Sequence, residues 1–98
     1  MDIHYHFNGT HFVWDERKAA RNPGKHDGVT FEQAATVFFD PLFRLVDAGR
    51  DDEARDAIIG YDCQSRVLFV VHLVIESEII RIISARRASK EELKNHDS

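Results

Sequence analysis

Hydrophobic and polar residues follow patterns along this chain that predict a β-sheet. Residues 3–7 alternate, residues 10–14 form a second strand-like run, and Asn8-Gly9 between them is typical of a two-residue hairpin turn. Apolar, β-branched runs in the second half predict four more strands, at residues 42–46, 55–62, 66–75 and 79–86. Short connections between the last three predict an antiparallel meander.

Three helices are predicted from residues whose side chains can cap a first turn. The capping residues are Asp15, Thr30 and Ser89. The helices that follow them are expected at residues 16–22, 31–39 and 89–96. Thr30 and Ser89 each stand three residues before a Gln or Glu, the spacing of a capping box. Pro23-Gly24 should end the first helix. The order β-β-α-α-β-β-β-β-α predicts an α+β fold, with two N-terminal helices on one face of an antiparallel meander and a C-terminal helix.

Length and composition narrow the class of protein. The 98 residues predict one domain over residues 1–98, with a hairpin at 3–14, helices at 16–39, a sheet at 42–86 and a last helix at 89–96. No apolar run approaches 18 residues, and the first residues lack a signal-peptide pattern. The single Cys63 suits a reducing cytoplasm. A net charge of −4 argues against a general nucleic-acid binder but allows a local basic site.

Arginines on the most apolar strand are the first candidate chemistry. Arg81 stands among isoleucines, and Arg86-Arg87 stand at the end of the same strand. A cation on a core strand needs a partner, which is either an acid such as Glu53 or Glu78 or an external phosphate. Arg81 and Arg86 are five residues apart, so they face one site only if the strand twists or bulges near Ser84.

Histidines near the N-terminus raise a second possibility. His4 and His6 point to one side of a strand, and His11 lies across the Asn8-Gly9 turn, so together they could bind zinc. No E-x-x-H or C-x-x-C motif accompanies them, and we therefore expect them to decorate a solvent-facing hairpin.

An ordered set of motifs resembles a known family. In the first half these are Phe12-Val13-Trp14-Asp15, Lys18, Asn22, Lys25-His26 and Val29-x-Phe31-x-x-Ala34. In the second half they are Glu53-x-Arg55, Ile59-Gly60, Leu68-x-Val70-Val71-His72 and Arg81-x-Ile83-Ser84-Ala85-Arg86-x-Ala88. Together they resemble the BrnT toxins over about residues 11–93.

The resemblance implies a RelE-like fold and a ribonuclease toxin of a bacterial type II toxin–antitoxin system. It also implies RNA cleavage that needs no metal or organic cofactor and inhibits translation. The implied partner is a BrnA-like ribbon-helix-helix antitoxin, which binds operator DNA and assembles with the toxin into a heterotetramer.

Site residues follow from the chemistry of metal-free RNA cleavage, which needs a base, an acid and a cation on the phosphate. The expected catalytic residues are Lys25, His26, His72, Arg81 and Arg86. The expected substrate-binding residues are Lys18, Arg55 and Arg87. Six of them also have a plainer interpretation besides the acid partner already given for Arg81: a polar turn for Lys25-His26, a half-buried core histidine for His72, solvated charge for Arg86-Arg87, and an ion pair within residues 51–56 for Arg55.

The chain departs from the family pattern at three places. The family reads K-H-G-V, whereas Asp27 lengthens this loop and places an acid near the candidate site. Pro23-Gly24 interrupts the first helix, and the N-terminal hairpin is long. Asp27, the net charge of −4 and the acidic residues between positions 47 and 56 oppose the approach of RNA. They favour an alternative, a catalytically weak or inactive member that acts mainly as an antitoxin-binding co-repressor.

Overall fold

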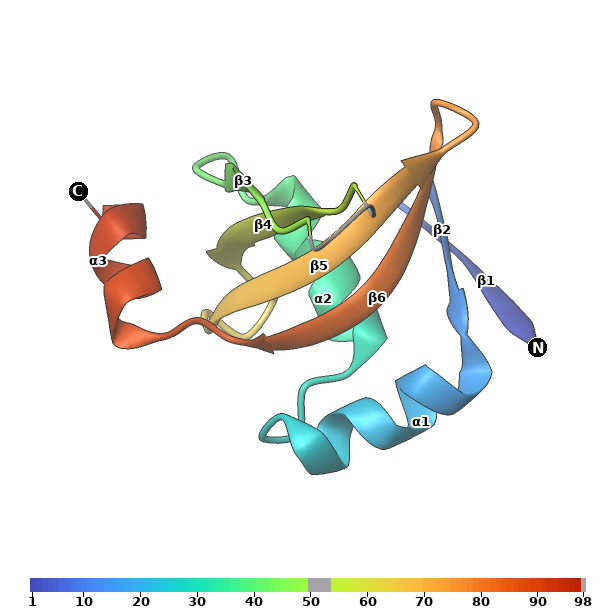
Figure 1. Cartoon of the computed structure of the whole chain (residues 1–98), viewed down its shortest axis with the longest axis horizontal. Coiled ribbons are helices and arrows are strands. Elements are labelled where there is room, and N and C mark those ends of the chain that lie inside the picture. Colours follow the sequence, from blue (N-terminus) through green and yellow to red (C-terminus); the bar gives the residue numbers. More distant parts are fainter. Residues whose placement is uncertain (50–53, 98) are drawn as a thin grey trace.

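One mixed sheet organises the molecule in a computed structural model that describes residues 1–49 and 54–97. Within these residues six strands are arranged in the order β1-β2-β6-β5-β4-β3 (Figure 1). The strands are β1 (Asp2–Phe7), β2 (Thr10–Asp15), β3 (Arg44–Asp47), β4 (Asp56–Tyr61), β5 (Val67–Ile75) and β6 (Ile79–Arg87). The helices are α1 (Glu16–Lys25), α2 (Phe31–Thr36) and α3 (Lys90–Asp97), with a 3-10 turn η1 (Val37–Phe39). The α+β class is therefore confirmed.

The N-terminal hairpin forms where the sequence predicts it. Asn8 and Gly9 have positive φ angles of 49° and 78°, as a type I′ turn between twisted strands requires. Alternation along β1 places Ile3, Tyr5 and Phe7 against the core and leaves His4 and His6 exposed.

The predicted meander of β4, β5 and β6 is also present, with both pairs antiparallel. A short parallel ladder that the sequence analysis did not predict joins the hairpin to it, from His11 opposite Ile79 to Val13 opposite Arg81. Local patterns carry no signal for this pairing, because the two strands are separated by most of the chain.

Helix α1 corrects the prediction that Pro23-Gly24 ends the first helix at residue 22. The helix continues through Pro23 to Lys25. Pro23 lies in the last turn, where it removes a single helical hydrogen bond. The turn is held by the His26 amide donating to the Asn22 carbonyl at 2.9 Å and the Gly28 amide donating to the Pro23 carbonyl at 2.8 Å. Burial of Asn22 adds tertiary contacts that outweigh helix propensity.

Helix α2 begins with the predicted capping box between Thr30 and Gln33 and tightens into η1. Its first turn brings Phe31 against Trp14, with ring centroids 5.7 Å apart in an edge-to-face arrangement. On the side that faces the sheet, Phe31, Ala34, Ala35 and Val37 are fully buried, and Phe38 is half-buried.

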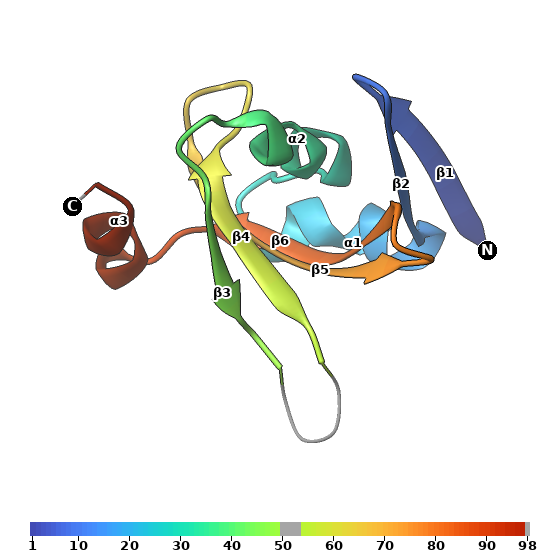
Figure 2. The same ribbon diagram turned by 90° about the horizontal axis from the view of Figure 1, so that it is seen from above.

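The prediction that two N-terminal helices share one face of the sheet is only partly correct. Helix α2 covers one face of β4, β5 and β6, whereas α1 runs beside β6 (Figure 1). Strands β3 and β4 extend away from the rest of the sheet, and α3 lies near β4 (Figure 2). The predicted Ser89–Glu92 capping box opens α3. None of the helices in residues 1–49 and 54–97 is long and apolar enough to cross a membrane.

Candidate functional site

A bulge in β6 decides which side chains reach the open face of the sheet. Val71 of β5 lies opposite Ser84 and His72 lies opposite Ile82, so Ile83 is an extra residue on β6. Ile82 and Ala85 point into the core, while Ile83 and Ser84 both face outward. The bulge that the sequence required near Ser84 is therefore present, and it turns Arg86 to the same face as Arg81.

Asn22 fixes α1 to the edge of β6 beyond the last pair with β2. Its side-chain amide donates to the carbonyls of Val29 and Ala85, both at 2.8 Å, and its oxygen accepts from the Ala85 amide at 3.3 Å. One buried side chain thus satisfies both polar backbone groups of Ala85. In the sequence Asn22 stands in a family motif without an evident role, because no local pattern shows which strand edge needs a partner.

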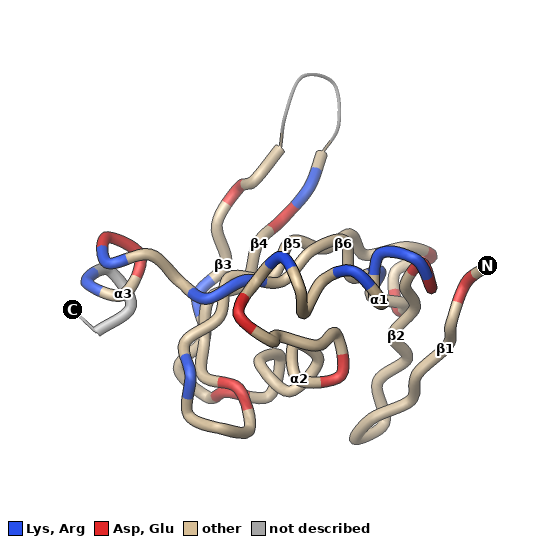
Figure 3. The backbone as a smooth tube through the Cα atoms, turned by 90° about the horizontal axis from the view of Figure 1, so that it is seen from below, with Lys and Arg blue, Asp and Glu red and all other residues tan. Residues whose placement is uncertain are grey.

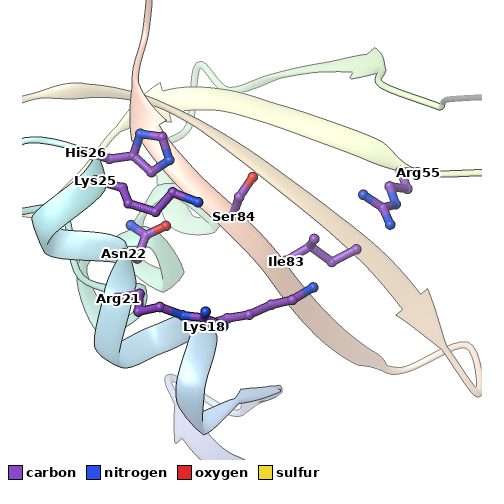
Figure 4. A pocket seen from close by; sticks show the side chains of 8 residues that line it. All are labelled: Lys18, Arg21, Asn22, Lys25, His26, Arg55, Ile83 and Ser84. Atoms are coloured by element: carbon purple, nitrogen blue, oxygen red, sulfur yellow. The ribbon is translucent and has the colours of Figure 1, made fainter.

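The space between α1 and β6 is a cavity of about 330 Å³ (Figure 4). Its described lining consists of Lys18, Arg21, Asn22, Lys25, His26, Arg55, Ile83 and Ser84. The side chains of Lys18 and Lys25 extend from α1 toward β6 (Figure 4). Arg55, which immediately precedes β4, lies on the other side of β6 and β5. Four of these eight residues are Lys or Arg, and none is Asp or Glu.

Concentrated positive charge in a chain of net charge −4 indicates an anion site. Lys and Arg positions gather on α1 and β6, which run side by side (Figure 3). Lys25 stands in the last turn of α1, where the helix dipole favours a cation. Repulsion among the remaining cations falls when an anion such as phosphate enters.

A second cavity of about 510 Å³ continues the first along the same face. Its described lining consists of Ala48, Gly49, Arg55, Phe69, Val71, Ser84 and Arg86. Arg55 and Ser84 line both cavities. We refer to the two cavities together as the basic groove.

Arg86 is held flat at the far end of the basic groove. Its two terminal nitrogens donate to the two carboxylate oxygens of Glu92, at 2.9 and 3.0 Å. The guanidinium carbon lies 4.2 Å from the ring centroid of Phe69, a cation–π contact. Hydrogen bonding from Arg86 is the main cause that lowers the pKa of Glu92, so this carboxylate stays ionised.

His72, the strand-borne acid–base candidate, lies on the opposite face of the sheet. It is 3% exposed, and its ring packs edge-to-face on Phe38 with centroids 4.9 Å apart. Its Nδ1 lies 3.2 Å from the Val70 carbonyl oxygen. Burial lowers the pKa of His72, which favours the neutral ring. The structure therefore does not bring His72 to the basic groove.

Two further predicted residues also lie apart from both cavities. Arg81 shares the face of Arg86, but its guanidinium donates to the Asp2 carboxylate at 2.6 Å. An acid partner was one of the two predicted possibilities; Glu53, one acid named for it, lies outside the described residues. Arg87 is exposed at the end of β6 and is not among the lining residues.

Asp27, the acid that departs from the family pattern, is exposed in the turn after α1. It adopts φ 53° and is followed by Gly28 at φ 77°, so the extra residue is accommodated by two left-handed positions. Asp27 is absent from the described lining of both cavities.

The hairpin histidines form a small cluster of their own. His4 Nδ1 and His11 Nε2 lie 2.8 Å apart, and the rings of His6 and His11 stack with centroids 4.3 Å apart. Desolvation and the neighbouring histidines lower the pKa of His11. In the part of the chain that the structure describes, no group of three or more His, Cys, Asp or Glu side chains is placed to hold a metal ion.

Comparison with known proteins agrees with the motifs. A family model described as "Ribonuclease toxin, BrnT, of type II toxin-antitoxin system" matches residues 14–92. No curated protein matches the chain significantly. The matched segment contains α1, β4, β5, β6 and every residue that lines the basic groove. The chain therefore belongs to the BrnT family of ribonuclease toxins of type II toxin–antitoxin systems.

Proposed function

We propose that this chain cleaves RNA in the basic groove without a metal ion, as the toxin of a toxin–antitoxin pair. The observation that carries the proposal is the first cavity, where four cations and His26 meet and no acid is among the described lining residues. Such a site attracts a phosphodiester, and its described lining offers none of the carboxylates that a metal ion would need.

The scissile phosphate is bound by cations from both walls of the cavity. Lys18 and Arg21 approach it from α1, and Arg55 approaches it from the side of β4. Arginine forks match pairs of phosphate oxygens, and fixed positive charge stabilises the extra charge that develops during attack. Ser84 adds a hydroxyl donor from the floor.

Lys25 and His26 supply the proton transfers. His26 accepts the proton of the 2′-OH while the 2′-oxygen bonds to phosphorus. The bond from phosphorus to the 5′-oxygen breaks, and the Lys25 ammonium gives its proton to that oxygen. The products are a 2′,3′-cyclic phosphate and a free 5′-OH, so DNA, which lacks the 2′-OH, is not a substrate.

Purified protein with single-stranded RNA and DNA of one sequence, in the presence of EDTA, tests this proposal. RNA alone should be cleaved, with a cyclic phosphate end. Lys25→Ala should reduce the rate by roughly 10²–10⁴-fold. Lys94→Ala is the matched control, because Lys94 is exposed on α3 and lines neither cavity. Cleavage that stops with EDTA, or that survives in Lys25→Ala, would contradict the mechanism.

The antitoxin is expected to neutralise the same groove. We propose a BrnA-like ribbon-helix-helix partner that inserts an acidic or extended segment among the groove's cations, which gives charge neutralisation and steric block together. Its dimerisation would give a heterotetramer and carry the toxin to operator DNA. The mass of the co-expressed complex, measured by light scattering, tests the two-to-two stoichiometry.

A second candidate is the weak or inactive member that acts as a co-repressor. Two of the predicted cations, Arg81 and Arg86, are already paired with Asp2 and Glu92, which reduces the positive charge offered to RNA. Intact RNA after incubation with folded protein, together with tight antitoxin binding, would favour this candidate over the ribonuclease.

A further inference from the structure

The second cavity of the basic groove has a different lining from the first. Phe69 and Val71 contribute apolar surface from β5, and Ala48 and Gly49 add no polar side chain. Its volume of about 510 Å³ falls in the range of small-molecule sites, roughly 300–1,000 Å³. A space of this size that offers the side chains of Phe69 and Val71 beside the guanidinium of Arg86 can hold a nucleobase.

Three of the five N–H donors of Arg86 already have acceptors within the protein. Its terminal nitrogens already donate to both oxygens of Glu92, and one donates also to the Arg87 carbonyl at 3.2 Å. Phe69 covers one side of the guanidinium, and the side chain is still 38% exposed, so its flat surface can also meet a ligand. Guanidinium planes are surfaces on which unpaired RNA bases stack.

Two contacts hold the guanidinium plane of Arg86 in place. Phe69 lies beneath the guanidinium at 4.2 Å, and the two-point contact with Glu92 resists rotation. A base that stacks on the exposed face of Arg86 would complete a layered arrangement of base, guanidinium and phenyl ring. Preformed geometry of this kind reduces the entropy lost on binding.

The spacing along β6 links this surface to the phosphate site. Ser84 lines both cavities, and Arg86 is the next outward-facing residue after it. Two residues of strand cover roughly 6.6 Å, at about 3.3 Å per residue. A single nucleotide can bridge that distance, so a phosphate beside Ser84 places a neighbouring base beside Arg86.

We infer that the second cavity is a nucleobase subsite, in which the base next to the scissile phosphate stacks on the Phe69–Arg86 pair. The inference rests on the proposed ribonuclease function and adds a source of substrate preference to it. Arg86 then acts in substrate binding and not as a phosphate clamp, and single-stranded RNA is favoured because its bases are free to leave a helical stack.

Titration with a dinucleotide analogue, followed by NMR, tests the subsite apart from catalysis. The analogue has one phosphodiester and 2′-fluorine in place of 2′-OH, so it binds without being cleaved. Two further analogues each lack one base. Removal of one particular base should raise the Kd by roughly 5- to 150-fold, the range of base–aromatic stacking, while removal of the other has a much smaller effect.

Variants then assign that effect to the Phe69–Arg86 pair. Arg86→Lys keeps the charge but loses the plane, and Phe69→Leu keeps an apolar side chain but loses the ring. Either should bind the intact analogue about as weakly as the wild type binds the analogue without the critical base. Phe43→Leu is the matched control, because Phe43 is 43% exposed and lines neither cavity. Thermal unfolding establishes that each variant is folded.

The possible outcomes separate the subsite from the ribonuclease. Equal affinity for all three analogues, or no saturable binding, overturns the subsite even if RNA is cleaved. Variants that discriminate between the analogues as the wild type does also overturn it. Base-dependent binding that Arg86→Lys abolishes supports the subsite, and it does so even if RNA stays intact, in which case only the proposed cleavage fails.

Discussion

The two faces of the β5–β6 pair carry different chemistry on the same strands. Toward α2, Leu68, Val70 and Ile82 belong to a close-packed core, and His72 joins them as a buried neutral ring. On the other face, Phe69, Val71 and Ser84 line an open groove with cations along its walls. The face of the sheet that a residue occupies, more than its type, therefore decides whether its side chain is accessible from the groove.

The bulge at Ile83 determines which side chains of β6 point into the groove. Strict alternation from Ile82 would turn Ser84 and Arg86 into the core, whereas the extra residue turns both outward. It also lies where the ladder to β2 has ended at Arg81 and α1 takes over the strand edge through Asn22. Irregularity of the strand and docking of the basic helix therefore occur at one place.

The largest expected effect distinguishes His26, which lines the groove, from His72, which is buried on the core face of the sheet. His26→Ala should lower kcat/KM for RNA cleavage by roughly 10²–10⁴-fold, because it removes a proton-transfer group from the groove. The melting temperature should change little, since His26 is only half-buried. Cleavage assays with His72→Leu beside it provide the contrast: a comparable loss of kcat/KM in that variant would show that the two faces are not functionally distinct.

The next largest effect is expected at Asn22, which joins α1 to β6. Asn22→Ala leaves the amide and carbonyl of Ala85 and the carbonyl of Val29 without their partner in a buried setting. We expect a loss of about 2–4 kcal/mol in the free energy of unfolding, from about 1–3 kcal/mol for each unsatisfied group with partial relief by water. Urea unfolding measures it.

The matched variant for Asn22→Ala is Arg17→Ala, an exposed position on the same helix that should stay within about 0.5 kcal/mol of the wild type. A loss for Asn22→Ala no larger than for Arg17→Ala would mean that α1 is positioned by other contacts.

Local signals predicted most of the fold. The Asn8-Gly9 turn and the Thr30 and Ser89 capping boxes depend on neighbours within a few residues, and each is present in the structure. What could not be predicted depends on distant partners. The parallel β2–β6 ladder and the extension of α1 past Pro23 both result from contacts between segments far apart in sequence.

The candidate site shows the same division between local and distant information. Lys18, Lys25, His26 and Arg55 were predicted and line one cavity; the first three lie on α1 or at its C-terminal end, and Arg55 comes immediately before β4. Arg21, Asn22 and Ser84 were not predicted as site residues, although α1 and the bulge place them there. Whether Arg81 and Arg86 share a face depended on one extra residue, which no strand pattern reveals.

Burial of His72 on the core face should make the free energy of unfolding depend on pH. Burial lowers the pKa of His72, so the unfolded chain takes up this proton near pH 6.5 while the folded chain takes it up only at lower pH. Stability is therefore full above pH 6.5 and falls as the pH decreases toward the folded-state value. Urea unfolding at pH 7.5 and 5.5 should show a smaller loss for His72→Leu than for the wild type. Equal losses would mean that His72 is not the group responsible.

The smallest effect concerns the pair that holds Arg86 flat. Glu92→Gln keeps the capping-box acceptor of α3 but removes the charge that faces Arg86. Since Arg86 is 38% exposed, we expect only about 0.2–1 kcal/mol less stability at pH 7.

The pKa of Glu92 is lowered in the folded state, so the ion pair stabilises above the unfolded value of 4.5. That stabilisation disappears as the pH falls through the folded value, and the difference between Glu92→Gln and the wild type should therefore vanish in acid. Glu91→Gln, one position earlier and exposed, is the control. A difference that persists in acid would come from packing of α3 and not from the charge that orients Arg86 over Phe69.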